Sequence, residues 1–308
     1  MPPLVIVAAV NGGYRMSHGV TRVPISPIEI AEEAAKCREA GAAVVHFHAR
    51  DSQGVTTGDV AVFQETIKLI RERSDILVQT TNGIGATRNK ITGEVQRPPL
   101  EERLKLLSLK PAPDLYGAAT GSTDYIHVHG GQPSESPFVN NLQWMEASIR
   151  HAHSTGSTVE FEMVHTPALY RLKRLAEGGL FDPNADYLWL THGAGIANFP
   201  PIARVLLQQI DEGRIVFPRA KWGVFGCGPH QFPMSAVGLA AGCDTLRIGL
   251  EDNELMPNGE PAETNHQLIR EAVKLAAFFN RRPATPSEAF EILGLNRTVN
   301  RARTASRS

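Results

Sequence analysis

The sequence alternates between short apolar segments rich in β-branched residues and longer segments with helical periodicity. The first apolar segment, 4–10, is continuously hydrophobic, which is typical of a parallel strand buried on both faces. This strand–helix unit recurs eight times, with expected strands at 4–10, 43–47, 76–80, 115–118, 159–163, 187–190, 221–225 and 245–248. Eight such units in 308 residues predict an α/β fold of the (β/α)8 TIM-barrel type.

The expected helices have recognisable start signals. Ser26-Pro27-Ile28-Glu29 combines a capping box with proline at the first helical position, and Thr285-Pro286-Ser287-Glu288 repeats this pattern near the C-terminus. The eight helices of the repeating units are expected at 27–40, 60–74, 101–109, 141–154, 167–176, 201–209, 232–241 and 262–280. We therefore expect one barrel domain over 1–282, followed by a C-terminal helix and basic tail over 283–308.

A doubly wound sheet is the main alternative fold. Its dinucleotide-binding form would place GxGxxG after a strand, at the start of a helix. Asn82-Gly83-Ile84-Gly85 follows the third expected strand but has neither this spacing nor a helix start at a third glycine. The sequence therefore favours the barrel.

Charge and cysteine content restrict the partners. The chain has 31 Lys and Arg against 32 Asp and Glu, a net charge of −1, which argues against nucleic acid or an anionic membrane surface as the main partner. No apolar run approaches the roughly 20 residues that a membrane span needs. Cys37, Cys227 and Cys243 are odd in number and form no CxxC pair, so we expect reduced thiols and a cytoplasmic protein.

Two histidines stand where a barrel carries its active site, at the C-terminal end of a strand. His46-Phe47-His48 ends the second expected strand, and side chains two apart on a strand point the same way. Both imidazoles would then face one point, as two ligands of a divalent metal do, and zinc is the commonest choice. The alternative is a polar pair in the core. A second such pair, His127 and His129, is expected in a loop, and His151 and His153 on a solvated helix surface.

The eighth strand supplies carboxylates. Arg247, Gly249 and Glu251 share one face if the strand geometry persists, and Asp252 begins the following loop. Strands two and eight flank strand one in a closed barrel, so Glu251 can reach the metal as a third ligand. Paired with Arg247, Asp252 is a candidate general base; the alternative is a structural ion pair at the barrel rim.

Two further segments are candidates for the active-site end of the barrel, where the strands have their C-terminal ends. The turn through Gly226 and Gly228 enters a helix, where exposed backbone N–H groups would suit an anion; the alternative is a tight turn without a ligand. Glu160 and Glu162 share one face of the fifth expected strand, although one of them could face a helix.

Taken together, these motifs resemble the β-keto acid cleavage enzyme family over roughly residues 3–280. The resemblance lies in segments 44–51 (VVHFHARD), 81–83 (TNG), 160–162 (EFE) and 246–253 (LRIGLEDN). It implies one zinc ion per chain on His46, His48 and Glu251, with Asp252 as base and Arg247 as its support. It also implies a reaction in which a β-keto acid condenses with acetyl-CoA, CoA moves to the substrate's acyl part, and acetoacetate leaves in a retro-Claisen step.

The resemblance further implies substrate contacts and an assembly. Thr81, followed by Asn82, and Thr120 match positions that contact substrate, and one of Glu160 and Glu162 matches a carboxylate of the pocket. A homo-oligomer, most simply a tetramer, is expected.

Two departures from the family pattern affect substrate and coenzyme. Family members that act on an aminated substrate have Thr-Gly-Ala-Glu after the first strand, whereas this chain has Asn11-Gly12-Gly13-Tyr14, so Asn11 and Tyr14 predict a substrate tail without an ammonium group. Many relatives have Gly-Arg-His-Gln after the seventh strand, whereas this chain has Gly228-Pro229-His230-Gln231 and so lacks a basic contact for CoA.

Parts of the sequence are compatible with two other functions. A metal-dependent hydrolase of the amidohydrolase kind would use an HxH pair with His165, His192 and Asp252, but its HxH belongs on the first strand. A non-catalytic barrel that binds a metabolite would explain the Tyr14 and Pro229 departures, but not the complete set of metal and base residues.

Overall fold

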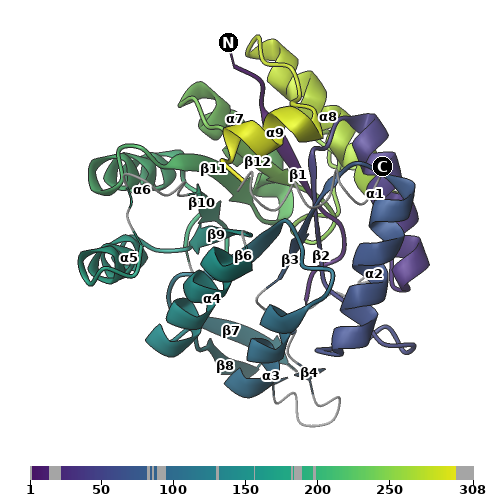
Figure 1. The fold of residues 1–308 in the computed structure, drawn as a ribbon. Coiled ribbons are helices and arrows are strands. Elements are labelled where there is room, and N and C mark those ends of the chain that lie inside the picture. Colours follow the sequence, from purple (N-terminus) through teal and green to yellow (C-terminus); the bar gives the residue numbers. More distant parts are fainter. Residues whose placement is uncertain are drawn as a thin grey trace.

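The computed structural model describes residues 2–13, 22–81, 84, 87–88, 95–129, 132–155, 157–181, 183, 189–196 and 199–295. Eight parallel strands close into a barrel with helices around it (Figure 1), which confirms the predicted TIM-barrel fold. In barrel order the strands are β1 (Val5–Ala9), β2 (Val44–Phe47), β3 (Leu77–Thr80), β6 (Leu115–Ala119), β9 (Thr158–Met163), β10 (Trp189–Ala194), β11 (Lys221–Gly226) and β12 (Thr245–Ile248).

The helices also follow the predicted order. They are α1 (Pro27–Ala40), α2 (Val60–Arg73), α3 (Leu100–Lys105), α4 (Leu142–Thr155), α5 (Pro167–Glu177), α6 (Ala203–Val216), α7 (Gln231–Ala240) and α8 (Asn265–Phe278). Several boundaries differ from expectation; α3, expected over 101–109, ends at Lys105 and is followed by a 3-10 turn over Leu106–Ser108. Helix α6 continues seven residues beyond 209 because its buried face extends through Ile210 and Gly213. Helix α8 begins later than 262 because the Thr264 side chain caps it by accepting from the Gln267 amide.

Two antiparallel hairpins interrupt the βα repeat. One pairs β4 (Thr87–Arg88) with β5 (Val95–Gln96), and the other pairs β7 (Thr123–His129) with β8 (Gln132–Phe138). The expectation that His127 and His129 lie in a loop is therefore wrong, because this segment is a hydrogen-bonded strand outside the barrel. Its partner strand contains two prolines and four polar residues, so the sequence pattern does not suggest a strand there.

Helix packing also corrects one surface assignment. His151 is half-buried on α4, and its Nε2 lies 3.3 Å from the hydroxyl oxygen of Tyr116 on β6. Burial lowers the pKa of His151, so the expected solvated position is wrong for this residue. The side chain of His153 lies outside the described residues.

The alternation of side chains along the strands separates two apolar clusters. On β1, Ile6 and Ala8 point outward to the helices, whereas Val5 and Val7 point into the barrel. Towards the C-terminal ends of the strands the buried residues become polar: His46, Gln79, Glu160, Thr191 and Arg247. The barrel interior is thus apolar at the N-terminal end and polar where the site lies.

A ninth helix, α9 (Pro286–Ile292), lies across the N-terminal end of the barrel (Figure 1). Ala289 and Leu293 are completely buried there, against the first inward residues of five strands, Val5, Val44, Leu77, Leu115 and Trp189. The predicted C-terminal helix therefore belongs to the barrel core. Residues 296–308 lie outside the described residues.

Leu293→Ala is expected to lower the free energy of unfolding by about 2–5 kcal/mol, because it leaves a cavity in this cluster. Urea denaturation followed by circular dichroism measures the change. Ser287→Ala, at an exposed position of the same helix, is the control and should change stability by less than about 0.5 kcal/mol. Equal stabilities of the two variants would show that α9 is not part of the folded core.

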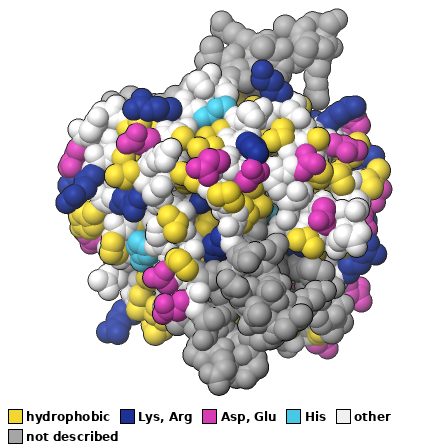
Figure 2. All heavy atoms as spheres, turned by 90° about the horizontal axis from the view of Figure 1, so that it is seen from below, with side chains coloured by type: hydrophobic (Ala, Val, Ile, Leu, Met, Phe, Trp, Pro, Cys, Tyr) yellow, Lys and Arg dark blue, Asp and Glu magenta, His cyan; other side chains and the backbone are white. Residues whose placement is uncertain are grey.

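The outer surface mixes charges. Figure 2 shows Lys and Arg side chains interspersed with Asp and Glu over the face seen from below. Within the described ranges, no helix has the length and apolar character to cross a bilayer.

Candidate metal and catalytic site

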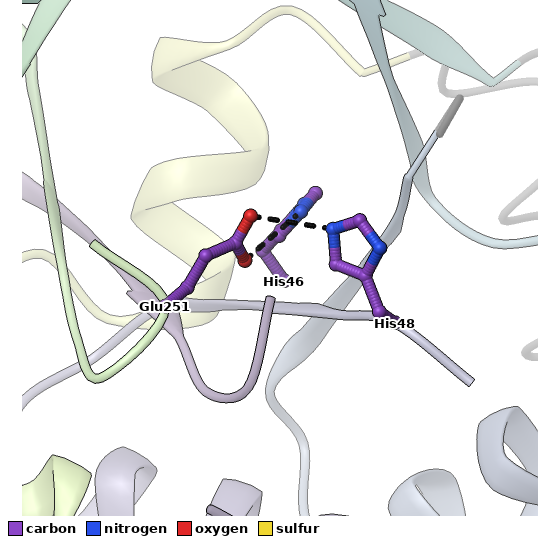
Figure 3. Close-up of side chains that lie close together, drawn as sticks. All are labelled: His46, His48 and Glu251. Carbon is purple, nitrogen blue, oxygen red and sulfur yellow. Dashed lines mark ion pairs between the residues drawn. The ribbon is translucent and has the colours of Figure 1, made fainter. Parts of the chain in front are cut away.

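Three side chains from two non-adjacent strands meet at the C-terminal end of the barrel. His46 lies within β2 and His48 directly follows that strand, while Glu251 lies just after β12; β1 pairs with both strands and brings them together. The carboxylate of Glu251 points between the two imidazoles (Figure 3), with Oε2 at 3.4 Å from His46 Nε2 and Oε1 at 3.2 Å from His48 Nε2.

These separations fit a metal centre. Two ligand atoms about 2.0–2.1 Å from one tetrahedral zinc ion lie about 3.3 Å apart. The three ligand atoms lie within 4.8 Å of one another, and the described residues contain no other such group of three. The Oε2 atom of Glu251 is buried and accepts no hydrogen bond, as expected of a ligand oxygen.

The charge states also suit metal binding, which needs neutral histidine and ionised carboxylate. Burial lowers the pKa of His46 to about 3, and the attraction of Glu251 does not reverse this shift. Burial acts to raise the pKa of Glu251, but Arg247 and the two histidines outweigh it and hold that pKa well below its ordinary value. His46 and Glu251 are therefore in the protonation states that metal binding needs near neutral pH.

The loop after β1 positions these ligands. The Asn11 side chain accepts from the His48 amide N–H and donates to the His48 carbonyl, each at 2.9 Å. Arg50 donates to the carbonyls of Asn11 and Gly12 at 2.9 and 2.7 Å. At Gly12, where φ is +62°, a Cβ would lie 2.8 Å from Glu251 Cγ. Asn11 was predicted to contact substrate, but its amide is engaged with the backbone and positions His48.

Arg247 connects three carboxylates. Its Nε and Nη2 bind Asp252 at 2.8 and 3.0 Å, its Nη2 also lies 2.7 Å from Glu251, and its Nη1 lies 3.0 Å from Glu162. Burial raises the pKa of Asp252 to about 6 even though Arg247 opposes the rise. A raised pKa makes Asp252 a stronger base than an exposed aspartate.

Both glutamates of β9 face the barrel interior, which answers the question left open by the sequence. Glu162 reaches Arg247, whereas Glu160 is completely buried and bound by Gln79 and Thr191. Burial and the neighbouring Glu162 raise the pKa of Glu160 to about 7. Gln79 and Thr191 were not predicted as site residues. Each lies two residues after an inward-facing residue of its strand, Leu77 and Trp189, so the period of two places both inside the barrel.

The remaining predicted residues have different surroundings. Thr81 is buried directly after β3, and Thr120 after β6 donates its hydroxyl to the Glu162 carbonyl at 2.8 Å. Tyr14 and Asn82 lie outside the described residues.

The glycine-rich turn after β11 does not form the predicted anion cradle. The Gly228 N–H donates to the Asp252 carbonyl at 2.7 Å, and the Cys227 N–H donates to Ala194. At Gly226 a Cβ would lie 2.6 Å from the His230 carbonyl oxygen, so this glycine is needed for close packing of the turn. The Gly228 amide thus binds the loop of Asp252 and the Cys227 amide binds the neighbouring strand, so we do not retain backbone anion binding by Gly226 and Gly228.

The histidines required by a hydrolase site are not at the cluster. His192 on β10 points outward against Trp222 and Gly213 and is 1% exposed. His165 follows β9, and its Nε2 lies 3.4 Å from the Ser122 carbonyl oxygen. The structure therefore gives no support to an amidohydrolase-type arrangement.

A closed barrel with a two-histidine, one-glutamate cluster beside an arginine-held aspartate defines a TIM-barrel enzyme with a candidate metal centre. The sequence profile of the β-keto acid cleavage enzyme family matches residues 3–295, and the chain belongs to this family. It is thus a C–C bond-cleaving enzyme of the transferase type.

Individual relatives span the full chain. The 3-keto-5-aminohexanoate cleavage enzyme of Acetoanaerobium sticklandii is 29% identical over 301 residues, which cover 96% of this chain and 100% of the relative. The 3-oxoadipate:acetyl-CoA acetyltransferase of Cupriavidus necator is 27% identical and covers 95% of both chains. Among solved structures, apo ObcA is similar in fold, with a TM-score of 0.70 and 18% identity over 89% of this chain, which spans 65% of the ObcA chain.

Proposed function

We propose that the protein is a zinc-dependent β-keto acid cleavage enzyme that uses acetyl-CoA as co-substrate. The observation that carries this proposal is the convergence of His46, His48 and Glu251 with the Arg247–Asp252 pair at one end of the barrel. The names of two relatives, 3-oxoadipate:acetyl-CoA acetyltransferase and 3,5-dioxohexanoate:acetyl-CoA acetone transferase from Paraburkholderia graminis, support acetyl-CoA as the second substrate.

The chain's own residues suit the first step, removal of a proton from C2 of the β-keto acid. When bound, zinc supplies Lewis-acid polarisation of the β-keto acid oxygens, which acidifies this proton. Asp252 takes the proton as general base. Arg247 binds both Asp252 oxygens, so it fixes the direction of the carboxylate and stabilises its charged form.

The later steps transfer CoA. The C2 carbanion equivalent attacks the thioester carbonyl of acetyl-CoA and displaces the CoA thiolate. The thiolate then adds to the C3 carbonyl, and the C2–C3 bond breaks in a retro-Claisen step that leaves the new CoA ester. The departing acetoacetate carbanion takes back the proton from Asp252. Glu162, at 3.0 Å from Arg247, faces the same interior and serves as the pocket carboxylate. Thr81 serves as a substrate contact from the end of β3.

A panel of β-keto acids with acetyl-CoA and zinc-loaded protein tests this function. Mass spectrometry should detect acetoacetate and a new CoA ester in equal amounts, and neither should form without acetyl-CoA. Consumption of the β-keto acid that requires the protein but not acetyl-CoA would contradict the proposal. Light scattering of the same preparation tests the further expectation of a homo-oligomer.

The substrate tail should carry no ammonium group. A buried ammonium needs an anionic or densely hydrogen-bonding partner, and position 14 is Tyr rather than Glu. We expect kcat/KM for neutral β-keto acids to exceed that for 5-amino-3-oxohexanoate by at least about 10-fold, or about 1.4 kcal/mol. Tyr14→Glu should shift the preference towards the aminated substrate, whereas Tyr14→Phe should not. A wild-type preference for the aminated compound would contradict this prediction.

A further inference from the structure

A chain of hydrogen bonds crosses the barrel interior and ends at a predicted metal ligand. The Thr191 hydroxyl donates to Glu160 Oε1, and Gln79 Nε2 donates to Glu160 Oε2 at 2.5 Å. The Gln79 Oε1 atom lies 3.0 Å from His46 Nδ1. The four residues come from β10, β9, β3 and β2, and all are at most 2% exposed.

The fold leaves space for this series of hydrogen bonds inside the barrel. Strand β6 lies between β3 and β9, and its residue paired with Glu160 is Gly117. Because glycine has no side chain, Gln79 can reach across β6 to Glu160. A Cβ at position 117 would lie 3.6 Å from His46 Cε1, so this residue also adjoins the imidazole.

The donors and acceptors in this series of hydrogen bonds fix the direction of each bond. In its ionised form, above its pKa of about 7, Glu160 only accepts hydrogen bonds, so it turns the NH2 end of Gln79 towards itself and the carbonyl end towards His46. An amide carbonyl only accepts as well, so His46 carries its proton on Nδ1. The lone pair then lies on Nε2, the nitrogen that faces Glu251 in Figure 3.

We propose that Glu160 is a positioning residue that acts through Gln79 to fix the tautomer and ring orientation of His46 for metal binding. Groups that hold the second nitrogen of a ligating histidine commonly change metal affinity by about 10–100-fold when they are replaced. This inference rests on the metal site of the proposed function, but the tautomer of His46 is a property of the metal-free protein.

The first test therefore needs no metal. Two-bond ¹H–¹⁵N correlation spectra of histidine-labelled, metal-free protein report the tautomer, with the His46 signals assigned by their loss in His46→Gln. At a pH well above 7, where Glu160 is ionised, we expect the Nδ1–H form in the wild type. In Glu160→Gln the new amide can pair with Gln79 in either direction, so a mixture of both tautomers is expected. An Nε2–H form in the wild type would overturn the proposal.

The second test is a swap. In Gln79→Glu/Glu160→Gln, the new carboxylate at 79 can accept from both His46 and the new amide at 160, while that amide still accepts from Thr191. Zinc affinity, measured by competition with a chromophoric chelator, should fall about 10–100-fold in Glu160→Gln and recover in the double variant. Unchanged affinity in the single variant, or no recovery in a folded double variant, would overturn the proposal.

A matched control separates positioning from stability. Gln209 on α6 is also completely buried, but it donates to the Met163 carbonyl at 2.8 Å on the outside of the barrel. Gln209→Leu should change stability and leave the His46 tautomer and zinc affinity as in the wild type. A wild type with the Nδ1–H tautomer that binds no divalent metal would support the positioning role and contradict the metal site of the proposed function.

Discussion

Asp252→Asn is expected to lower kcat by about 10²–10⁴-fold, because asparagine keeps the shape of the side chain but cannot accept the substrate proton. The fold should survive, since Arg247 keeps Glu251 and Glu162 as partners at 2.7 and 3.0 Å. Bound zinc should also remain, because Asp252 is not among the three ligands. Steady-state kinetics with metal analysis of the same sample measures both quantities.

The control for this variant lies at the other end of the same strand. Asp244 precedes β12 and accepts from the Trp222 amide N–H at 3.2 Å, an interaction that asparagine can keep. Asp244→Asn should therefore retain wild-type kcat. Near-normal turnover in Asp252→Asn would assign proton removal to another group, and Glu162 would be the next residue to replace because it shares Arg247 and faces the interior.

His46→Ala is expected to weaken zinc binding by at least about 100-fold. Replacing a residue that only hydrogen-bonds to a ligand weakens binding by about 10–100-fold, and loss of the ligand itself costs more. The variant should be purified with little bound zinc, as measured by plasma mass spectrometry, and its activity should fall in parallel. A high zinc concentration should not restore wild-type turnover, since the geometry of the three donors is lost.

A second histidine–glutamate pair gives the control. His266 Nδ1 lies 3.2 Å from Glu33 Oε1, between helices α8 and α1, where no second histidine completes a ligand set among the described residues. His266→Ala should keep full zinc occupancy. Full occupancy in His46→Ala, or loss of zinc only when His127 or His129 is replaced, would contradict the predicted centre.

Local pattern was sufficient for the fold and for the candidate ligand cluster of His46, His48 and Glu251. The eightfold alternation predicts the barrel because a parallel strand buried on both faces must be continuously apolar and must be followed by a crossover helix. His46 and His48 could be placed on one face because the period of a strand is two. Barrel closure then brings Glu251 to them, since β1 pairs with both β2 and β12.

Contacts between distant segments decided the rest. No sequence pattern shows that Asn11 binds the backbone of His48, that the Gly228 amide is used by the Asp252 carbonyl, or that Gln79 reaches Glu160 across Gly117. The partners in these contacts are separated by 24 to 81 positions in the chain, and a polar side chain has the same appearance in a sequence whether it meets substrate, backbone or another side chain. Buried polar groups must be hydrogen-bonded, and each one pairs with whichever group lies near it in space. Only the closed barrel therefore determines which of these residues are free to contact substrate and which hold other residues in position.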